Sequence, residues 1–189
     1  KDQPNLALVI NEYLAKRGTT MLSRTLITSL LLLGASSAVT AFADDHTTVV
    51  NQQSIADPGT EWLSYGRDYT EQRFSPLDQV NRDNVGELDL AWSFKFETAR
   101  GMAATPLVHN GVIYISTGWS HVYALDARSG EQLWHYDAEV PKSHLIKACC
   151  GPVNRGVAIW QADDNAPLQV FFGALDGRLI ALDAATGEI

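Results

Sequence analysis

One short segment occurs twice in the second half of the chain, and this repetition is the feature that most constrains the fold. Residues 124–131 and 181–188 both read Ala-Leu-Asp-Ala-x-x-Gly-Glu, and their first residues are 57 positions apart. Each copy is typical of a strand that runs into a tight turn, in which Asp accepts backbone hydrogen bonds and Gly supplies a positive φ. The first copy continues to Trp134, whereas the second stops at Ile189. We therefore expect a repeat protein, present as a fragment that breaks off inside a repeat.

Further features indicate that the repeat is a blade of a β-propeller. Residues 106–116 form two β-like runs around an Asn-Gly pair, a strong hairpin signal. Residues 84–92 are a weaker relative of the repeat, and Trp92 lies 42 positions before Trp134, close to the length of a four-stranded blade. One such sheet cannot bury both faces alone, so blades must stack, and a recurring Trp offers a flat surface that docks blade on blade. We predict an all-β fold, a partial β-propeller of antiparallel four-stranded blades; the alternative is an ordinary pair of hairpins.

The N-terminal part of the chain reads as a targeting segment. Residues 21–43 have the form of a secretory signal peptide, with Arg24 in a short basic region and an apolar stretch over residues 26–39. The small-x-small sequence that ends at Ala43 predicts cleavage after that residue. We therefore expect a periplasmic protein with no stable membrane span after signal removal; an uncleaved membrane anchor is the alternative.

The other segments complete the expected domain organisation. Residues 1–20 precede a natural-looking start at Met21 and are expected to be translated upstream sequence without order. Residues 44–60 are expected to be a flexible mature N-terminus. The propeller domain is predicted over residues 61–189, with an insertion around residues 149–154 that accounts for the longer second spacing.

The net charge limits the classes of binding partner, and the cysteines indicate a possible disulfide. The net charge of −8 argues against nucleic acid and anionic membranes as partners, because both require basic patches. The two cysteines, Cys149 and Cys150, are adjacent, and an exported protein permits a disulfide. A disulfide between adjacent cysteines closes too short a loop to stabilise the fold much, so it would serve as a flat local surface. Two free or separately buried thiols are the alternative. Arg155 follows closely, and its guanidinium suits carboxylates and quinone oxygens, although a surface arginine is the simpler interpretation.

The remaining polar residues predict no site. The histidines His109, His121, His135 and His144 show no metal-ligand spacing, and we expect them to be structural or exposed. Residues 163–165 read Asp-Asp-Asn between two strand-like runs and are expected to form a solvated hairpin loop.

Several motifs resemble the quinoprotein alcohol dehydrogenases that use pyrroloquinoline quinone (PQQ). The most specific is Cys-Cys-x-x-Val-Asn-Arg-Gly, which begins at Cys149. The resemblance covers about residues 61–189 and is closer to the ethanol and quinohaemoprotein enzymes than to the methanol enzymes. The other matching segments, in the same order, are residues 62–68, 73–77, 104–108 and 175–179.

The resemblance implies a fold, a cofactor and an activity. It implies an eight-bladed propeller with PQQ on its axis beside a calcium or lanthanide ion, a disulfide between Cys149 and Cys150 against the quinone, and Arg155 on the quinone oxygens. The catalytic base and the metal ligands would lie beyond Ile189, so no catalytic or metal-binding residue is assigned. The implied reaction oxidises primary alcohols to aldehydes and passes electrons to a cytochrome c, and the fragment is expected to be inactive alone. The resemblance also allows a haem c in a further domain and a homodimer.

One residue departs from the family pattern, and two other functions stay open. Many members carry a glutamate that binds the quinone shortly before Thr105-Pro106, where this chain has Ala103. Glu97 is too far along the chain to replace it without a different loop. The alternatives are a non-enzymatic propeller scaffold of the cell envelope and a PQQ-dependent sugar or polyol dehydrogenase.

Overall fold

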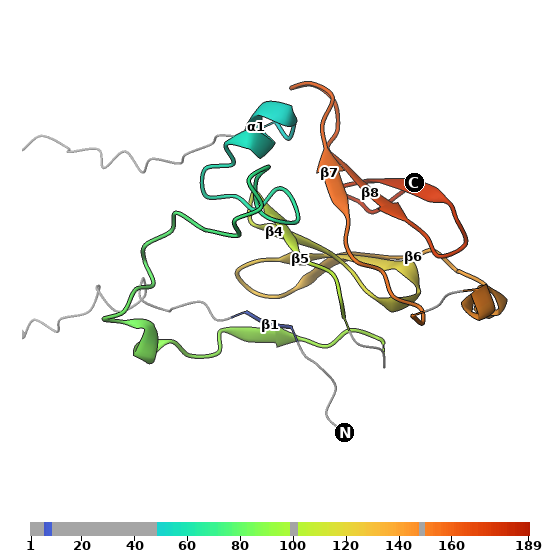
Figure 1. The fold of residues 1–189 in the computed structure, drawn as a ribbon, viewed down its shortest axis with the longest axis horizontal. Coiled ribbons are helices and arrows are strands. Elements are labelled where there is room, and N and C mark those ends of the chain that lie inside the picture. The colour runs from blue at the N-terminus through green and yellow to red at the C-terminus, as the bar shows by residue number, and fades with distance from the viewer. Residues whose placement is uncertain (1–5, 9–48, 99–101, 148–149) are drawn as a thin grey trace, which may run out of the picture. The chain divides into compact units, whose positions relative to one another are not determined.

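The computed structural model describes residues 6–8, 49–98, 102–147 and 150–189 (Figure 1). The predicted signal peptide and its cleavage site lie outside these residues. Leu6–Leu8 lie in the range expected to be without order and form the short strand β1. No helix in the described ranges is long and apolar enough to span a membrane.

One antiparallel sheet has four strands. These are β3 (Leu107–His109), β4 (Val112–Ser116), β5 (His121–Asp126) and β6 (Gln132–Asp137), hydrogen-bonded in that order. Between β3 and β4, Asn110 and Gly111 both have positive φ, 48° and 74°, as a two-residue hairpin requires. The predicted hairpin and the predicted four-stranded antiparallel sheet are therefore confirmed.

Two smaller sheets flank the four-stranded one in sequence. β7 (Ala158–Trp160), β8 (Gln169–Gly173) and β9 (Leu179–Asp183) form a three-stranded antiparallel sheet. β2 (Trp92–Phe94) pairs with β1. Between β7 and β8, Asp163 Oδ1 accepts hydrogen bonds from the amides of Asn165 and Ala166 at 2.9 and 3.0 Å, which confirms the predicted exposed hairpin loop.

Helical structure in the described ranges is short. It comprises the single turn of α-helix α1 (Gln52–Ala56) and the 3-10 turns η1 (Val85–Glu87), η2 (Gly118–Ser120) and η3 (Lys142–Lys147). α1 begins with a capping box between Asn51 and Ser54, which satisfies amide groups that the helix cannot pair internally.

The two copies of the repeat form the same turn. Asp126 Oδ1 accepts the amides of Arg128 and Ser129 at 2.9 and 2.7 Å, and Gly130 follows with φ of 73°. The second copy is equivalent: Asp183 Oδ1 accepts the amides of Ala185 and Thr186, both at 2.9 Å, and the φ of Gly187 is 76°. The roles that the sequence predicts for Asp and Gly are confirmed in both turns.

A tryptophan of each repeat lies over the turn of the following repeat. The indole N–H of Trp92 donates to the carbonyl of Ala127 at 3.2 Å, and that of Trp134 donates to Ala184 at 2.9 Å. A Cβ added to Gly130 would lie 2.4 Å from the Trp92 ring, and one added to Gly187 would lie 2.8 Å from the Trp134 ring. Glycine is therefore required twice over at these positions, by its φ and by the ring above it. The expected docking role of the recurring tryptophan is confirmed.

The third, weaker copy of the repeat is not a turn of this kind. Residues 84–92 begin with η1, and Trp92 is the first residue of the strand β2, whereas Trp134 lies inside the strand β6. The reason is local, because Asn84 Oδ1 accepts the Asn81 amide at 2.8 Å and its Nδ2 donates to the Gln79 carbonyl at 2.7 Å. The side chain thus caps the preceding residues, and only the tryptophan is shared with the repeat.

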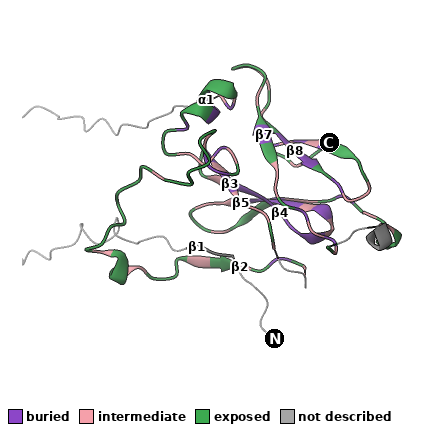
Figure 2. Ribbon diagram, in the orientation of Figure 1, coloured by how far each residue is buried: buried purple, intermediate pink, exposed green. Residues whose placement is uncertain are grey.

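Most residues of the two central strands of this sheet, β4 and β5, are buried (Figure 2), and their side chains belong to two separate clusters. The side chains of β4 point alternately to the two faces of the sheet. On one face, Tyr114 packs with Trp134 of β6 and with Val170 and Leu182 of the three-stranded sheet. Its neighbours on β4 and β5 face the other way and join a second cluster with Phe94 and Phe96; these are Ile113, Ile115, Tyr123 and Leu125. This sheet is therefore covered on one side by the preceding tryptophan-bearing strand and on the other by the next repeat, as in stacked blades.

Candidate functional site

The segment between β6 and β7 carries the candidate site. Neighbouring strands elsewhere in the two larger sheets are joined by short turns, whereas residues 138–157 form a long connection that contains η3. This connection includes residues 149–154, where the insertion is predicted, and it holds the Cys-Cys-x-x-Val-Asn-Arg motif.

The structure places two of the three predicted cofactor-binding residues in this connection. Cys150 lies in an exposed turn, and Arg155 is an exposed residue of the same loop. Cys149 lies outside the described residues, so the disulfide between Cys149 and Cys150 stays a prediction. The loop thus presents Cys150 and a guanidinium group on its surface.

A buried proline anchors the first half of the loop. Pro152 is among the fully buried side chains, and its carbonyl accepts the backbone amide of Trp119 at 2.8 Å. Trp119 and Ser120, in η2, adopt positive φ of 66° and 64°. Such values are uncommon outside glycine, so the η2 turn holds an unfavourable backbone conformation at the point where it contacts the loop.

A buried asparagine anchors the second half. Asn154 is 8% exposed, and its Oδ1 accepts the hydroxyl of Ser116, at the end of β4, at 2.7 Å. Its Nδ2 donates to the carbonyl of Gly173, the last residue of β8, at 2.9 Å. The same Oδ1 accepts the Gly156 amide at 3.2 Å, which fixes the backbone on either side of Arg155. The loop is therefore tied to both larger sheets directly next to its exposed arginine.

The segment with Ala103 passes beside this loop. A Cβ built on Gly156, whose φ is 149°, would lie 3.9 Å from the carbonyl oxygen of Thr105. Ala103 itself is exposed, so the position expected to carry a glutamate presents a methyl group. Glu97 lies near β5 and β6: burial is the main cause that raises the pKa of Tyr123 and lowers the pKa of His135, and the charge of Glu97 makes a smaller contribution to both.

Two histidines form a pair that sequence reasoning missed. His121 Nδ1 lies 2.9 Å from His135 Nε2, and the His135 ring stacks on Tyr123 with centroids 4.2 Å apart. Burial lowers the pKa of His135, and the neighbouring His121 lowers it further. The signal was available, since residues 14 apart across a tight hairpin become cross-strand neighbours. Within the described ranges, no group of three or more His, Cys, Asp or Glu side chains is arranged to hold a metal ion.

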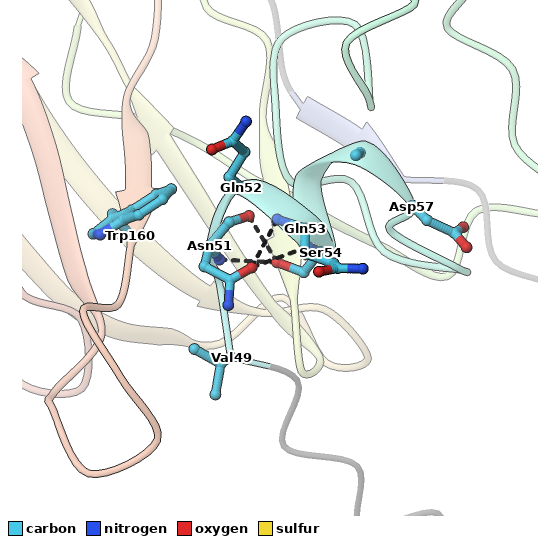
Figure 3. A pocket seen from close by; sticks show the side chains of 8 residues that line it. Val49, Asn51, Gln52, Gln53, Ser54, Asp57 and Trp160 are labelled. Atoms are coloured by element: carbon cyan, nitrogen blue, oxygen red, sulfur yellow. Dashed lines mark hydrogen bonds between the residues drawn. The ribbon is translucent and has the colours of Figure 1, made fainter.

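A shallow groove lies elsewhere, over α1. It encloses about 930 Å³ and is lined by Trp160, by residues of α1 and by residues on either side of α1, with none of the predicted site residues among them. Asn51 and Ser54 are already engaged with each other in the capping box (Figure 3). The groove therefore adds nothing to the loop site.

The chemistry of the loop suits a planar ligand that bears carbonyl and carboxylate oxygens. A guanidinium offers a rigid fork of donors that pairs with two oxygens at once. Arg155 is exposed, and the backbone beside it is held by buried polar contacts. Its guanidinium is a positive group in a chain of net charge −8. The residues present fit a quinone such as PQQ, although Ala103 removes one contact that the resemblance implies.

Comparisons with known proteins agree with the motifs. The sequence profile of the glucose/ethanol/alcohol dehydrogenase β-propeller domain that uses PQQ matches residues 62–189. The dehydrogenase subunit of an alcohol dehydrogenase (quinone) from Gluconobacter oxydans is 48% identical over 167 residues, which are 87% of this chain and 21% of the relative. A 1-butanol dehydrogenase (cytochrome c) from Thauera butanivorans is 50% identical over 130 residues, 69% of this chain and 18% of the relative. The chain thus spans about a fifth of the length of the relatives it matches.

Solved structures support the fold and the subfamily. The quinohemoprotein alcohol dehydrogenase of Comamonas testosteroni matches with a TM-score of 0.65 and 47% identity, over 72% of this chain and 20% of that structure. A europium-containing methanol dehydrogenase matches with a TM-score of 0.63 but only 35% identity, over 72% of this chain and 23% of that structure. Both results confirm the predicted β-propeller fold, and the difference in identity agrees with a closer relation to the quinohaemoprotein enzymes than to the methanol enzymes.

Proposed function

The chain belongs to the PQQ-dependent glucose, ethanol and alcohol dehydrogenases with a β-propeller domain, and we propose that its protein oxidises primary alcohols to aldehydes with bound PQQ. When bound, PQQ supplies the redox chemistry by accepting a hydride equivalent from the alcohol. The residues described here hold the cofactor and do not react with the alcohol. The base and the metal ligands are not assigned to any residue of this chain.

The observation that carries this proposal is the anchored loop around Arg155. Its guanidinium would bind the quinone oxygens, and the Cys149-Cys150 pair would provide a flat surface against the ring. Asn154 and Pro152 are buried residues of the loop, and their hydrogen bonds hold the backbone next to Arg155 in place. A scaffold protein would have no use for an exposed arginine supported in this way, which favours the enzyme over a non-enzymatic propeller.

The partners, the metal and the location are part of the same proposal. We infer that electrons leave to a cytochrome c, since a relative of this chain carries that acceptor in its name. The metal beside the quinone would be calcium or a lanthanide, and europium occurs in one related structure. The signal-like sequence over residues 21–43 supports export to the periplasm, with cleavage after Ala43. A sugar or polyol is the second substrate class, because the family includes glucose dehydrogenases.

Cofactor binding by the full-length gene product tests this function directly. The product would be purified without cofactor and titrated with PQQ in the presence of calcium, with quenching of tryptophan fluorescence as the readout. Reduction of an artificial electron acceptor would then be measured with ethanol, 1-butanol, glucose and glycerol. Saturable binding and alcohol-dependent reduction are the expected results. A protein that does not bind PQQ, with calcium or with a lanthanide, would exclude the enzyme and leave the scaffold.

A further inference from the structure

The side chain of Asn154 makes three hydrogen bonds, two of which reach strands outside its own loop. Its side-chain amide joins three segments: the end of β4 through Ser116, the end of β8 through Gly173, and the loop itself through Gly156. Ser116 is completely buried and Asn154 nearly so, which leaves water little access to these bonds. Buried hydrogen bonds of this kind are costly to leave unmade, so they select one arrangement of the loop.

The position of these bonds in the chain matters as much as their number. Asn154 directly precedes Arg155, and the Gly156 amide directly follows it. The backbone on both sides of the arginine is therefore held by one side chain. That side chain is in turn held by two sheets that belong to successive repeats.

We propose that Asn154 is a positioning residue for the cofactor. It sets the place and direction of the Arg155 guanidinium relative to the seam between the two sheets before the cofactor binds. This inference rests on the proposed PQQ site and adds to it a residue that does not touch the ligand. It predicts that changes at Asn154 alter cofactor affinity only as long as Arg155 is present.

An isosteric change is the sharpest probe of this role. In an Asn154→Asp variant the carboxylate still accepts from Ser116 and Gly156, but its other oxygen faces the Gly173 carbonyl, which it cannot bind. We expect the Kd for PQQ to rise about tenfold, which corresponds to about 1.4 kcal/mol. Ser116→Ala removes one of the three contacts and is expected to raise the Kd about threefold. It serves as the second variant if Asn154→Asp does not fold.

A double-mutant cycle separates positioning from a general structural effect. In an Arg155→Ala background, Asn154→Asp should change the Kd less than twofold, because the group that it positions is gone. Tyr114→Phe is the matched control, since the Tyr114 hydroxyl bonds the Ala184 carbonyl at 3.4 Å and joins the same two sheets away from the loop. We expect this control to lower the Tm and to leave the Kd for PQQ within twofold of wild type.

Hydrogen exchange in the cofactor-free protein gives a readout that does not need PQQ. Peptides covering residues 150–158 should exchange faster in Asn154→Asp and Ser116→Ala than in wild type or Tyr114→Phe. Unchanged exchange, an unchanged Kd, or an equal loss of affinity in the Arg155→Ala background would each overturn the positioning role. If wild type fails to bind PQQ while the exchange difference is seen, the proposed function fails, and Asn154 orders a loop that serves another ligand or none.

Discussion

Trp134 donates its indole N–H to the carbonyl of Ala184 at 2.9 Å, and its ring covers Gly187, which lies in the turn of the next repeat. Trp92 has the same relation to Ala127 and Gly130. The contact therefore recurs at each junction between described repeats, and it combines a directional hydrogen bond with close packing of a large ring. In each repeat, the tryptophan ring lies so close to the turn of the next repeat that the residue beneath it must be glycine.

Replacing the glycine under the ring should destabilise the fold more than replacing a glycine that has free space around it. Gly187→Ala forces a methyl group to 2.8 Å from the Trp134 ring in addition to an unfavourable φ of 76°. We expect a loss of about 3 kcal/mol in the free energy of unfolding. Gly111→Ala is the control, because its φ is 74° but nothing lies within 4 Å, and it should cost only about 1 kcal/mol. Urea denaturation of the full-length protein measures both, and equal losses would show that the ring contact contributes nothing.

Arg155 should contribute directly to cofactor affinity. Arg155→Ala removes a charge-assisted contact worth about 1.5–3 kcal/mol, so the Kd for PQQ should rise roughly tenfold or more. Arg155→Lys keeps the charge but lacks the planar guanidinium, so its Kd for PQQ should lie between those of wild type and Arg155→Ala. The comparison variant is Arg128→Ala, an exposed arginine in the hairpin turn of β5 and β6, which should bind PQQ like wild type. Equal affinities for Arg155→Ala and Arg128→Ala would remove Arg155 from the site.

The alanine at position 103 should lower affinity for the cofactor. Ala103→Glu restores a carboxylate at an exposed position, where a longer side chain has room, and should strengthen PQQ binding by about 1.5–3 kcal/mol. Ala103→Gln has a similar size without the charge and is expected to gain less. Calorimetric titration of the three proteins decides the point. Identical affinities would mean that this chain binds its cofactor without that contact.

The His121–His135 pair predicts a loss of stability in acid. Burial, together with the charge of His121, lowers the pKa of His135 below its ordinary value of 6.5. The unfolded chain therefore binds more protons than the folded chain once the pH falls below about 6.5, and the free energy of unfolding decreases there. His135→Gln should flatten this dependence between pH 7.5 and 5.5 in urea denaturation. The same slope in wild type and variant would assign the acid sensitivity to other groups, such as the buried His109, whose pKa burial also lowers.

Local chemistry made most of the fold predictable. Asp126 and Gly130 define their turn within five residues, so the same letters at Asp183 and Gly187 predict the same turn. The exception at Asn84 is also local, since its side chain finds partners upstream that the pattern of letters does not reveal. The order of residues thus predicts a turn well when the hydrogen bonds stay inside the motif.

The site was predictable only in part, because its support comes from far along the chain. Cys150 and Arg155 lie only five residues apart and could be named from the motif, whereas Ser116 and Gly173 are 38 and 19 residues from the Asn154 that they bind. No spacing rule links these positions before the two sheets are in place. The disulfide of Cys149 stays a prediction, since that residue lies outside the described ranges.

The loop at Asn154 crosses a seam, and this has a thermodynamic consequence. Its anchors belong to two successive sheets, so any slip of one sheet against the other displaces the arginine, and any ligand held by the arginine resists that slip. Cofactor affinity and the stability of the contact between the two sheets are therefore linked, and each changes the other by the same free energy. A cofactor bound by Arg155 is therefore expected to stabilise the contact between the two neighbouring repeats.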